Sequence, residues 1–437
     1  MCPRETAARL RTLILTVALM GAVHAVAPAQ ASAAPELRGV QLHSLWGNST
    51  DSDIDRELEM SRLANTNVVR VDVGWSSLES NGKGEINQWY LNRLDRFMTG
   101  AQSRGIKVIA TLWSTPCWAS SAPESLKQGC TGSWWDRGAI TNYPPTRTTD
   151  YADFTRWFVS RYGPKLAAVE VWNEPNNLPN QGSQYWKTTT PAQDYTNLLK
   201  AAYPAAKAAN AEVPVLAGSI SGNDRVFLQD LYAAGAKGFY DGMAIHPYND
   251  TGFSDLKLMR AAQTAAGDST PIWVTEFGFP TGTSSQWHVS ETQQANLLTT
   301  SLSDLAALPW VKAAIVYNLR DKGTNPNNME DNFGLLRRDY TPKPAYAALT
   351  TALATTSPIT RRPRRLKLRT VRKTGHVFAF IAAKPSGKVR LAVGRCARPR
   401  ARRARVMTVR LNRLGRAVRR VGTTRSLAGC RLYARLV

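Results

Sequence analysis

The chain has 437 residues, of which 43% are hydrophobic and 20% are charged, a composition that excludes an intrinsically disordered protein. Its net charge of +24 would suit a nucleic-acid-binding protein, but this charge is unevenly distributed. Residues 361–437 hold 25 Lys and Arg and no acidic residue, whereas residues 34–360 carry a net charge of −3. The basic charge therefore belongs to a C-terminal appendage and not to the main body.

Residues 1–33 are predicted to form a secretory signal peptide. Three arginines precede an apolar run from Leu13 to Val26, and alanines at positions 29, 31 and 33 follow it. The alternative is an N-terminal membrane anchor, but the run is shorter than the roughly 20 residues that a membrane span needs. We therefore expect a secreted or cell-wall-associated protein that has no transmembrane segment after cleavage.

Four cysteines remain once the signal peptide and Cys2 are removed. An exported protein permits disulfide bonds, and four cysteines allow three pairings. We favour one bridge in the main body, between Cys117 and Cys130, and one in the basic region, between Cys396 and Cys430. The other pairings stay open.

Eight short β-rich segments alternate with amphipathic helical patterns in the main body. The strands are expected at residues 38–43, 67–73, 106–112, 167–172, 213–218, 242–247, 272–277 and 312–318. The helical patterns include residues 52–64, 87–104, 148–162, 191–209, 289–307 and 343–354. Most strands are apolar on both faces, which is typical of a parallel sheet covered on both sides.

Eight β-then-α units predict an α/β fold, a (β/α)8 TIM barrel over residues 34–354. A doubly wound open sheet is the alternative. Such a sheet usually has a Gly-rich phosphate-binding turn after its first strand, and the segment His43–Trp46 is not one. The barrel is therefore the favoured fold.

The basic region begins with a Pro- and Arg-rich linker at residues 355–365. Residues 366–437 then show period-two alternation, which predicts a small C-terminal all-β domain. Arginines at outward positions would attract an anionic cell-wall polymer. The alternative is a solvated basic face without a ligand. Aromatic residues are too few for a base-stacking platform, so we expect no dedicated nucleic-acid site.

Polar and aromatic residues gather at the expected C-terminal ends of the strands, where TIM barrels place their active sites. These candidate site residues are His43, Arg70, Trp75, Trp113, Asn173, Glu174, His246, Tyr248, Glu276 and Tyr317. Glu174 follows the fourth strand and Glu276 ends the seventh, so two carboxylates would face each other across the barrel mouth. Glycoside hydrolysis uses such a pair.

We assign Glu174 as the acid/base and Glu276 as the nucleophile. Arg70 would keep Glu276 ionised, Tyr248 would donate a hydrogen bond to it, and Asn173 would hold a sugar 2-hydroxyl. Arg70 has a structural alternative, an ion pair with Asp72. Likewise, His43 is either a substrate-binding residue or a satisfied rim histidine.

Two motifs give the chain a family resemblance. Trp172–Asn176 (WNEPN) and Trp273–Gly278 (WVTEFG) resemble the acid/base and nucleophile motifs of clan A retaining glycoside hydrolases, especially family 39-like and family 5-like proteins. The resemblance covers roughly residues 36–354. It implies a (β/α)8 fold, net retention and double displacement, and hence an O-glycosyl hydrolase.

The resemblance also assigns residues by their places in the motifs. Asn173 and Glu174 match the asparagine and acid/base pair, and Glu276 matches the nucleophile. Arg70 matches the arginine of strand 2, and His246 and Tyr248 match a pair on strand 6. The clan often has a tryptophan at the end of strand 8. Tyr317 stands there in this chain, so either it forms the floor of the glycone subsite or that subsite is open.

The main body is rich in tryptophan, whose ring can stack on the apolar face of a sugar. Trp75, Trp118, Trp134, Trp135, Trp186 and Trp287 fall in βα loops, where they would contact substrate. Trp89, Trp157, Trp273 and Trp310 lie in or beside helix or strand patterns and are expected in the core.

Metal-ligand spacings and phosphate loops are absent from the sequence, so we expect no cofactor and no essential metal. We also expect a monomer whose partner is a carbohydrate substrate. The competing class is a non-catalytic carbohydrate-binding or adhesion protein on the same barrel scaffold.

Overall fold

The computed structural model describes residues 35–128, 138–176, 185–283 and 287–355, together with six strands of the C-terminal region. The chain divides into two compact units, Met1–Thr355 and Thr356–Val437. The predicted signal peptide, most of the linker, and Cys130, Trp134 and Trp135 lie outside the described residues.

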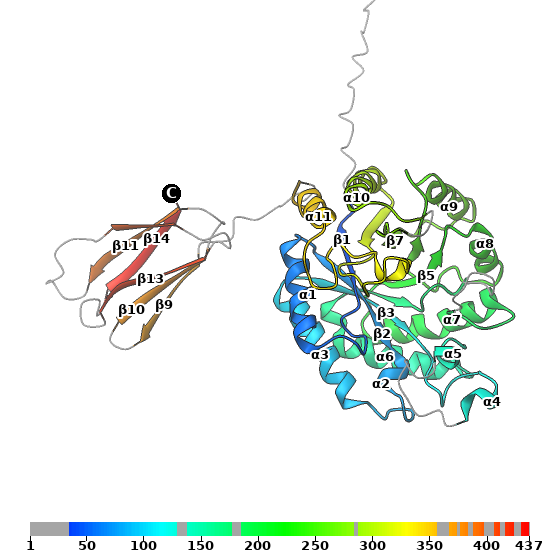
Figure 1. The fold of residues 1–437 in the computed structure, drawn as a ribbon. Coiled ribbons are helices and arrows are strands. Elements are labelled where there is room, and N and C mark those ends of the chain that lie inside the picture. The colour runs from blue at the N-terminus through cyan, green and yellow to red at the C-terminus, as the bar shows by residue number, and fades with distance from the viewer. Residues whose placement is uncertain are drawn as a thin grey trace, which may run out of the picture. The chain divides into compact units, whose positions relative to one another are not determined.

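Eight parallel strands close into a barrel in sequence order, and helices surround them (Figure 1). The strands are β1 (Leu37–Leu42), β2 (Val68–Gly74), β3 (Lys107–Trp113), β4 (Leu166–Val171), β5 (Val215–Ser221), β6 (Gly242–His246), β7 (Ile272–Phe277) and β8 (Val311–Val316). The pairing of β8 with β1 closes the ring. The predicted (β/α)8 barrel is confirmed.

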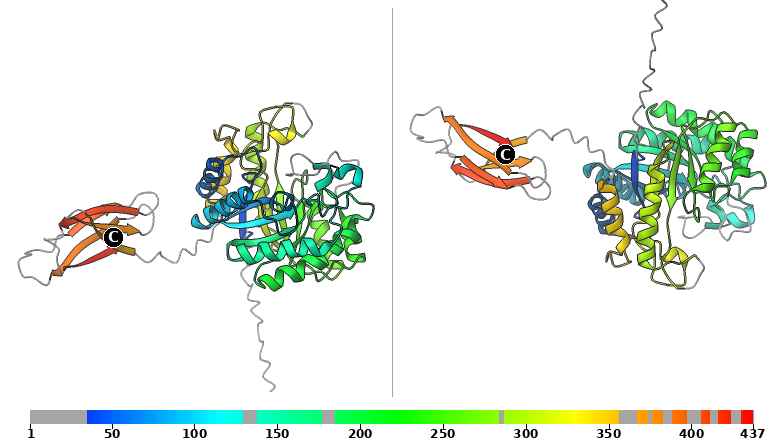
Figure 2. Two further views of the ribbon diagram at one scale, coloured as in Figure 1. Left: turned by 90° about the horizontal axis from the view of Figure 1, so that it is seen from below. Right: turned by 90° about the horizontal axis from the view of Figure 1, so that it is seen from above.

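Helices lie on the outside of the strands in all views (Figure 2). The described helices are α1 (Asp51–Leu63), α2 (Trp75–Leu78), α3 (Gln88–Ser103), α4 (Glu124–Lys127), α5 (Gly138–Thr141), α6 (Thr148–Tyr162), α7 (Pro191–Ala209), α8 (Arg225–Ala233), α9 (Ser254–Ala265), α10 (Glu291–Ala306) and α11 (Pro344–Thr355). Thr50 and Ser290 begin α1 and α10 with capping boxes, which satisfy the free N–H groups at these helix starts.

The strands separate two apolar layers because successive side chains point to opposite faces. On β2, Val69, Val71 and Val73 pack in the layer beneath the helices. Val68 belongs to a second cluster, to which each of β2–β7 contributes one residue and β8 contributes two. This second cluster fills the inside of the barrel. Arg70 and Asp72 follow Val68 on the same inner face and point toward the mouth.

Local departures from regular strand geometry position both motif glutamates. The backbone after β4 is left-handed at Trp172 (φ 67°) and at Glu174 (φ 47°). The β7–β8 register shifts between Val274 and Phe277, next to Glu276. Left-handed non-glycine residues are uncommon and concentrate at functional sites. Both glutamates therefore occupy irregular backbone at the barrel mouth.

The C-terminal unit contains two three-stranded antiparallel sheets, ordered β13-β10-β9 and β12-β11-β14. Its strands are β9 (Lys367–Lys373), β10 (His376–Ala382), β11 (Lys388–Cys396), β12 (Val406–Arg410), β13 (Arg416–Thr423) and β14 (Cys430–Leu436). The register places Cys396 opposite Cys430. In the barrel unit Cys117 is disulfide-bonded, but its predicted partner Cys130 is outside the described residues, so both pairings stay predictions.

Among the described residues, no helix combines the length and the hydropathy that a bilayer span requires.

Candidate active site

Arg70 is the electrostatic centre of the barrel mouth. Its side chain is fully buried and donates hydrogen bonds to Glu170 (2.7 Å), Gln41 (3.1 Å) and Asn173 (2.8 Å). The Nη1 atom, which donates to Gln41, also donates to the carboxylate of Glu276. The charges of Glu170 and Glu276 outweigh the effect of burial and raise the pKa of Arg70. A permanent cation therefore lies between two carboxylates, and Arg70 forms its ion pairs with Glu170 and Glu276 and not with Asp72.

Glu276 is held from both of its oxygens. Oε1 accepts a hydrogen bond from Arg70, and Oε2 accepts one from the hydroxyl of Tyr248 at 2.7 Å. Its side chain is 10% exposed. Two donors in fixed positions orient the carboxylate toward the barrel axis. The expected contacts of Glu276 with Arg70 and Tyr248 are both present in the structure.

Glu174 reaches the same space from the end of β4. Its Oε1 lies 2.8 Å from Nδ1 of His246, and its side chain is 12% exposed. The same Nδ1 atom lies 3.6 Å from Oε2 of Glu276. His246 therefore bridges the two carboxylates. The hydrogen-bonding atoms of these three residues all lie within 4.8 Å of one another.

His246 responds to both carboxylates. Burial by itself would lower its pKa, but the charge of Glu276 and the hydrogen bond to Glu174 outweigh burial and raise the pKa above its usual value. Its Nε2 atom has no hydrogen-bond partner among the described residues. The two glutamates therefore favour a proton on His246 more than water does.

A single cation would also fit the spacing of Glu174, His246 and Glu276. However, Glu276 is already paired with Arg70 and Nδ1 of His246 is already bonded to Glu174, so a metal ion would have to replace both contacts. The donor set therefore fits a pair of acid–base carboxylates better than a metal centre.

An aromatic cluster borders this centre at the β1 and β8 ends. The ring of His43 lies 4.1 Å from Trp46 and 5.5 Å from Tyr317, measured between centroids. Nζ of Lys322 lies 4.7 Å from the centre of the Trp46 ring and binds Glu330 at 2.7 Å. Burial and the nearby Lys322 charge lower the pKa of His43 well below its usual value, so it is neutral.

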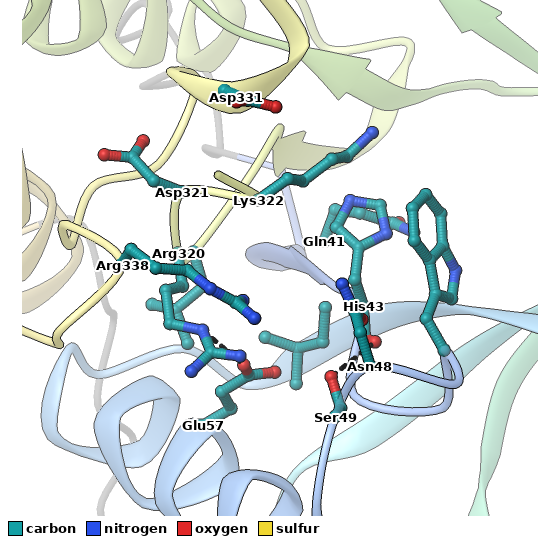
Figure 3. Close-up of a pocket in the computed structure, with 13 residues that line it drawn as sticks. Gln41, His43, Asn48, Ser49, Glu57, Arg320, Asp321, Lys322, Asp331 and Arg338 are labelled. Atoms are coloured by element: carbon teal, nitrogen blue, oxygen red, sulfur yellow. Dashed lines mark hydrogen bonds and ion pairs between the residues drawn. The ribbon is translucent and has the colours of Figure 1, made fainter. Parts of the chain in front are cut away.

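A pocket of about 210 Å³ opens between the β1 and β8 ends (Figure 3). Figure 3 shows His43 and Lys322 on one side and Glu57, Arg320 and Arg338 on the other. Gln41, which also bonds to Arg70, lines this pocket. Gln41 therefore links this pocket, through Arg70, to Glu276.

Several tryptophans lie elsewhere than predicted. Trp75 begins α2 and is fully buried, stacked on Phe154 and hydrogen-bonded to Glu79, so its assignment as a substrate-binding residue is wrong. Trp186 is 2% exposed and packs against Trp172. Both are expected in substrate-contacting loops, but contacts with Phe154 and Trp172, respectively, bury their rings in the core.

Two other tryptophans face outward. Trp89, expected in the core, is 59% exposed because it lies at the start of α3 on its solvent side. Trp287 is exposed as expected of a loop residue. By contrast, Trp113 ends β3 at the barrel mouth and lines a small cavity with Trp46 and Asp72. Trp113 is therefore the predicted site tryptophan that the structure keeps near the glutamates.

Sequence reasoning missed three residues that organise the centre: Gln41, Asp72 and Glu170. Each is a polar side chain on the inner face of a strand, where apolar residues would otherwise pack. Asp72 accepts hydrogen bonds from Gln41 and from Trp46, both at 3.3 Å. The available signal was period-two spacing, because Gln41 precedes His43 and Asp72 follows Arg70 by two residues.

Comparisons with known proteins identify the family of the chain. The family model described as "Cellulase (glycosyl hydrolase family 5)" matches residues 27–313, more than half of the chain. The chain belongs to glycosyl hydrolase family 5. The resemblance stated from the two motifs is thereby confirmed, as is the enzyme class of O-glycosyl hydrolase.

Solved structures share the fold of this family 5 chain. A family 39 glycoside hydrolase from Bacteroides cellulosilyticus WH2 superposes with a TM-score of 0.57 at 20% identity, covering 88% of this chain and 81% of that one. GH5_18 from Streptomyces cattleya gives a TM-score of 0.57 at 17% identity, with 75% and 82% covered. A family 39 enzyme from Xanthomonas axonopodis pv. citri gives 0.55 at 18% identity, with 90% and 93% covered.

One curated protein also aligns with part of the family 5 chain. "Beta-glucosidase 34" of Oryza sativa subsp. japonica is 23% identical over 132 residues, which is 30% of this chain. The alignment spans only 25% of the length of that relative.

Proposed function

We propose that this family 5 chain is a secreted retaining glycosidase that cleaves O-glycosidic bonds of a β-linked poly- or oligosaccharide. The carrying observation is the proximity of Glu174 and Glu276, whose nearest oxygens are separated by no more than 4.8 Å. Retaining enzymes hold their carboxyl groups about 5–5.5 Å apart, whereas inverting enzymes need about 6.5–9.5 Å to admit a water molecule. The separation therefore favours double displacement.

In the first step Glu276 attacks the anomeric carbon, and the bond from that carbon to the leaving oxygen breaks. Arg70 and Tyr248 hold the attacking carboxylate in one orientation, which limits the entropy lost on reaching the transition state. Glu174 gives its proton to the leaving oxygen. The product is a glycosyl ester of Glu276 and a free alcohol or shortened saccharide.

In the second step water attacks the same carbon. The Glu174 carboxylate, now deprotonated, takes a proton from this water, and the ester bond to Glu276 breaks. His246 contacts both carboxylates and acts as a positioning residue through both steps. Asn173, fixed by Arg70 at 2.8 Å, supplies an amide for the sugar 2-hydroxyl.

Two features support a β-linked saccharide as substrate. The pocket between the β1 and β8 ends is lined by an indole ring, an imidazole ring and several hydrogen-bonding groups, as sugar sites usually are. The partly aligned rice protein is named as a β-glucosidase, and the fold neighbours include proteins named as β-xylosidases.

The experiment screens 4-nitrophenyl β-glycosides with the wild type, Glu276→Gln and Glu174→Ala. We expect the first variant to lose at least 10³-fold in kcat, because no ester can form. Glu174→Ala should hydrolyse the activated substrate slowly and regain rate when azide is added, since azide needs no general base. A 2-deoxy-2-fluoro glycoside should label Glu276, as detected by peptide mass.

Two results would contradict this assignment. A label on another residue would remove the nucleophile role from Glu276. Saccharide binding by the wild type without hydrolysis of any substrate, and with unchanged binding in both variants, would favour the non-catalytic carbohydrate-binding alternative.

We further infer that the protein is exported and that its C-terminal unit binds an anionic cell-wall polymer. The support is the run of 25 basic residues without an acidic one in residues 361–437, after an N-terminal pattern typical of a signal peptide. Pull-down of the full chain on teichoic-acid-containing cell wall should succeed at low salt and fail at high salt. No retention at low salt would overturn this proposal.

A further inference from the structure

A small cavity with a carboxylate in its wall lies at the C-terminal ends of β2 and β3. It has a volume of about 30 Å³, and Asp72 lines it together with Trp46 and Trp113. The other lining residues are Leu45, Gly74, Ser77, Tyr90 and Ser114. A water molecule needs about 10–15 Å³ of such space. The cavity therefore admits a hydroxyl or a hydroxymethyl arm, but not a sugar ring.

The walls of the cavity suit one hydroxyl-bearing arm of a carbohydrate. The indole groups of Trp46 and Trp113 come from the ends of β1 and β3, and Asp72 comes from β2 between these strands. The hydroxyl of Ser114 contacts that of Ser76 at 3.0 Å, so polar groups also lie on the β3 side. Aromatic faces beside a carboxylate form an arrangement that recognises both the apolar and the polar parts of a sugar.

Asp72 retains hydrogen-bonding capacity in this position. Its Oδ2 accepts from Gln41 and from Trp46 at 3.3 Å each, which are long contacts, and no described residue donates a hydrogen bond to Oδ1. A carboxylate accepts about four hydrogen bonds. The nearby guanidinium of Arg70 is committed to Glu170 and Glu276.

The placement of Asp72 also links it to the reacting groups. It lies two residues beyond Arg70 on the inner face of β2, and Gln41 donates to Asp72 while accepting from Arg70. Burial raises the pKa of Asp72 to about 6, with the charge of Glu276 adding to the effect and that of Arg70 opposing it. A hydroxyl donor would relieve this poorly solvated carboxylate.

We propose that Asp72 is a specificity-determining residue whose carboxylate accepts a hydrogen bond from one hydroxyl of the sugar on the glycone side of the cleaved bond. This inference rests on the proposed glycosidase function and deepens it. Substrates that lack that hydroxyl leave the buried carboxylate unpaired, so they are rejected more strongly than an apolar pocket would reject them.

The experiment measures kcat/KM for 4-nitrophenyl β-D-glucoside, β-D-mannoside and β-D-xyloside, and then for the monodeoxy analogues of the best of these. The wild type should discriminate against one analogue, or against the xyloside that lacks the hydroxymethyl arm, by at least tenfold. Asp72→Asn should reduce that ratio toward one while leaving the other ratios in the series unchanged.

Two further variants test the cavity itself. A Cβ atom at residue 74 would lie 3.0 Å from Oγ of Ser77 and 3.4 Å from that of Ser114, so Gly74→Ala narrows the cavity. It should raise KM for the preferred substrate more than for the analogue. The matched control is Asp268→Asn, the same chemical change at a buried site that bonds to Tyr240. It should leave all the ratios unaltered.

The outcomes separate the two proposals. If the wild type hydrolyses no glycoside, the proposed function fails. If it hydrolyses them but no single hydroxyl matters tenfold, or Asp72→Asn keeps the wild-type ratio, the inference about Asp72 fails alone. An equal loss on every substrate would also overturn it, because Asp72 would then act only through Gln41 and Arg70.

Discussion

Arg70 both stabilises the barrel mouth and orients the proposed nucleophile, Glu276. It is buried between Glu170 and Glu276, and a buried cation is tolerated only when charge partners and hydrogen bonds replace its water shell. Gln41 and Asn173 take further donors of the guanidinium. The orientation of Glu276, the proposed nucleophile, therefore depends on the planar guanidinium of Arg70, whose N–H groups point in fixed directions. The ammonium group of a lysine could not make the same set of hydrogen bonds.

His246 gives the site a pH-dependent stability. Because its pKa is raised in the fold, the protonated imidazole is favoured in the native state, despite burial, by Glu276 and Glu174. Its contribution is fully present below the unfolded value of about 6.5 and is lost as pH rises through the folded pKa. We expect His246→Gln to reduce the free energy of unfolding more at pH 5.5 than at pH 9, as measured by urea denaturation.

A pH-independent difference between wild type and His246→Gln would contradict this view of His246. Asp72, with a pKa of about 6, also titrates in this range, but it is present in both proteins, so its contribution cancels in the difference between them.

Asp72 should affect stability in a different way, because its ionised carboxylate lowers the free energy of unfolding at high pH. Its pKa rises from 3.8 to about 6, chiefly through burial, so the fold disfavours the ionised form. The cost grows between pH 4 and pH 6 and is on the order of 3 kcal/mol above that range. Asp72→Asn should therefore match the wild type at pH 4 and be more stable at pH 8 by up to this amount.

Asp268 supplies a comparison of opposite sign. Burial would raise its pKa, but hydrogen bonds from Tyr240 and Thr270 outweigh burial and lower it. Relative to the wild type, Asp268→Asn should become less stable as pH rises through the acidic range. Asp72→Asn should become more stable than the wild type over the same rise in pH. If both variants behave alike in urea denaturation, the assigned environment of Asp72 is wrong.

At the scale of elements, the alternation of strands and helices was readable because burial imposes regular patterns. The expected helices at 148–162 and 191–209 coincide with α6 and α7, and the strand at 272–277 coincides with β7. Both glutamates also lie together at the barrel mouth, where parallel strand ends must meet.

The ion-pair partners of Arg70 could be predicted only in part. Arg70 bonds to Glu276 as expected, and not to Asp72, which was the alternative; its second partner, Glu170, was not expected. Pairing across strands depends on register, which the strand pattern does not encode at single-residue precision. Trp75 was misplaced because the short helix α2 follows β2 directly and turns the ring into the core.

The closure of the barrel depends on a close backbone approach at β1. Gly39 is paired with Val68, and a Cβ atom at Gly39 would lie 1.8 Å from the Val68 carbonyl oxygen. Gly39→Ala should therefore force the strands apart and destabilise the unit by at least about 3 kcal/mol, or prevent folding. Thermal unfolding followed by circular dichroism measures this.

Gly82→Ala is the matched control for Gly39→Ala. The new Cβ atom would meet only the flexible end of Glu85, at 3.2 Å from Oε1. A large destabilisation in this control, or a wild-type melting temperature for Gly39→Ala, would contradict the role given to β1.

On the scale of the whole molecule, catalysis and basic charge belong to different compact units. All the site residues described here lie in the unit that ends at Thr355, while the 25 basic residues lie in residues 361–437. The barrel closes on itself through β1 and β8, so its hydrogen bonding needs no strand from the C-terminal unit. Each unit is therefore expected to act without the other.

A chain ending at Thr355 tests this separation. Its kcat/KM on a soluble aryl glycoside should stay within about twofold of the full chain, because an uncharged substrate is not attracted by the basic charge of the C-terminal unit. On insoluble cell-wall material the full chain should be faster at low salt, since binding of its basic unit raises the local concentration of the barrel. That advantage should vanish at high salt, where screening weakens attraction to an anionic polymer. An advantage that persists unchanged in high salt would show that contacts other than charge hold the C-terminal unit to its partner.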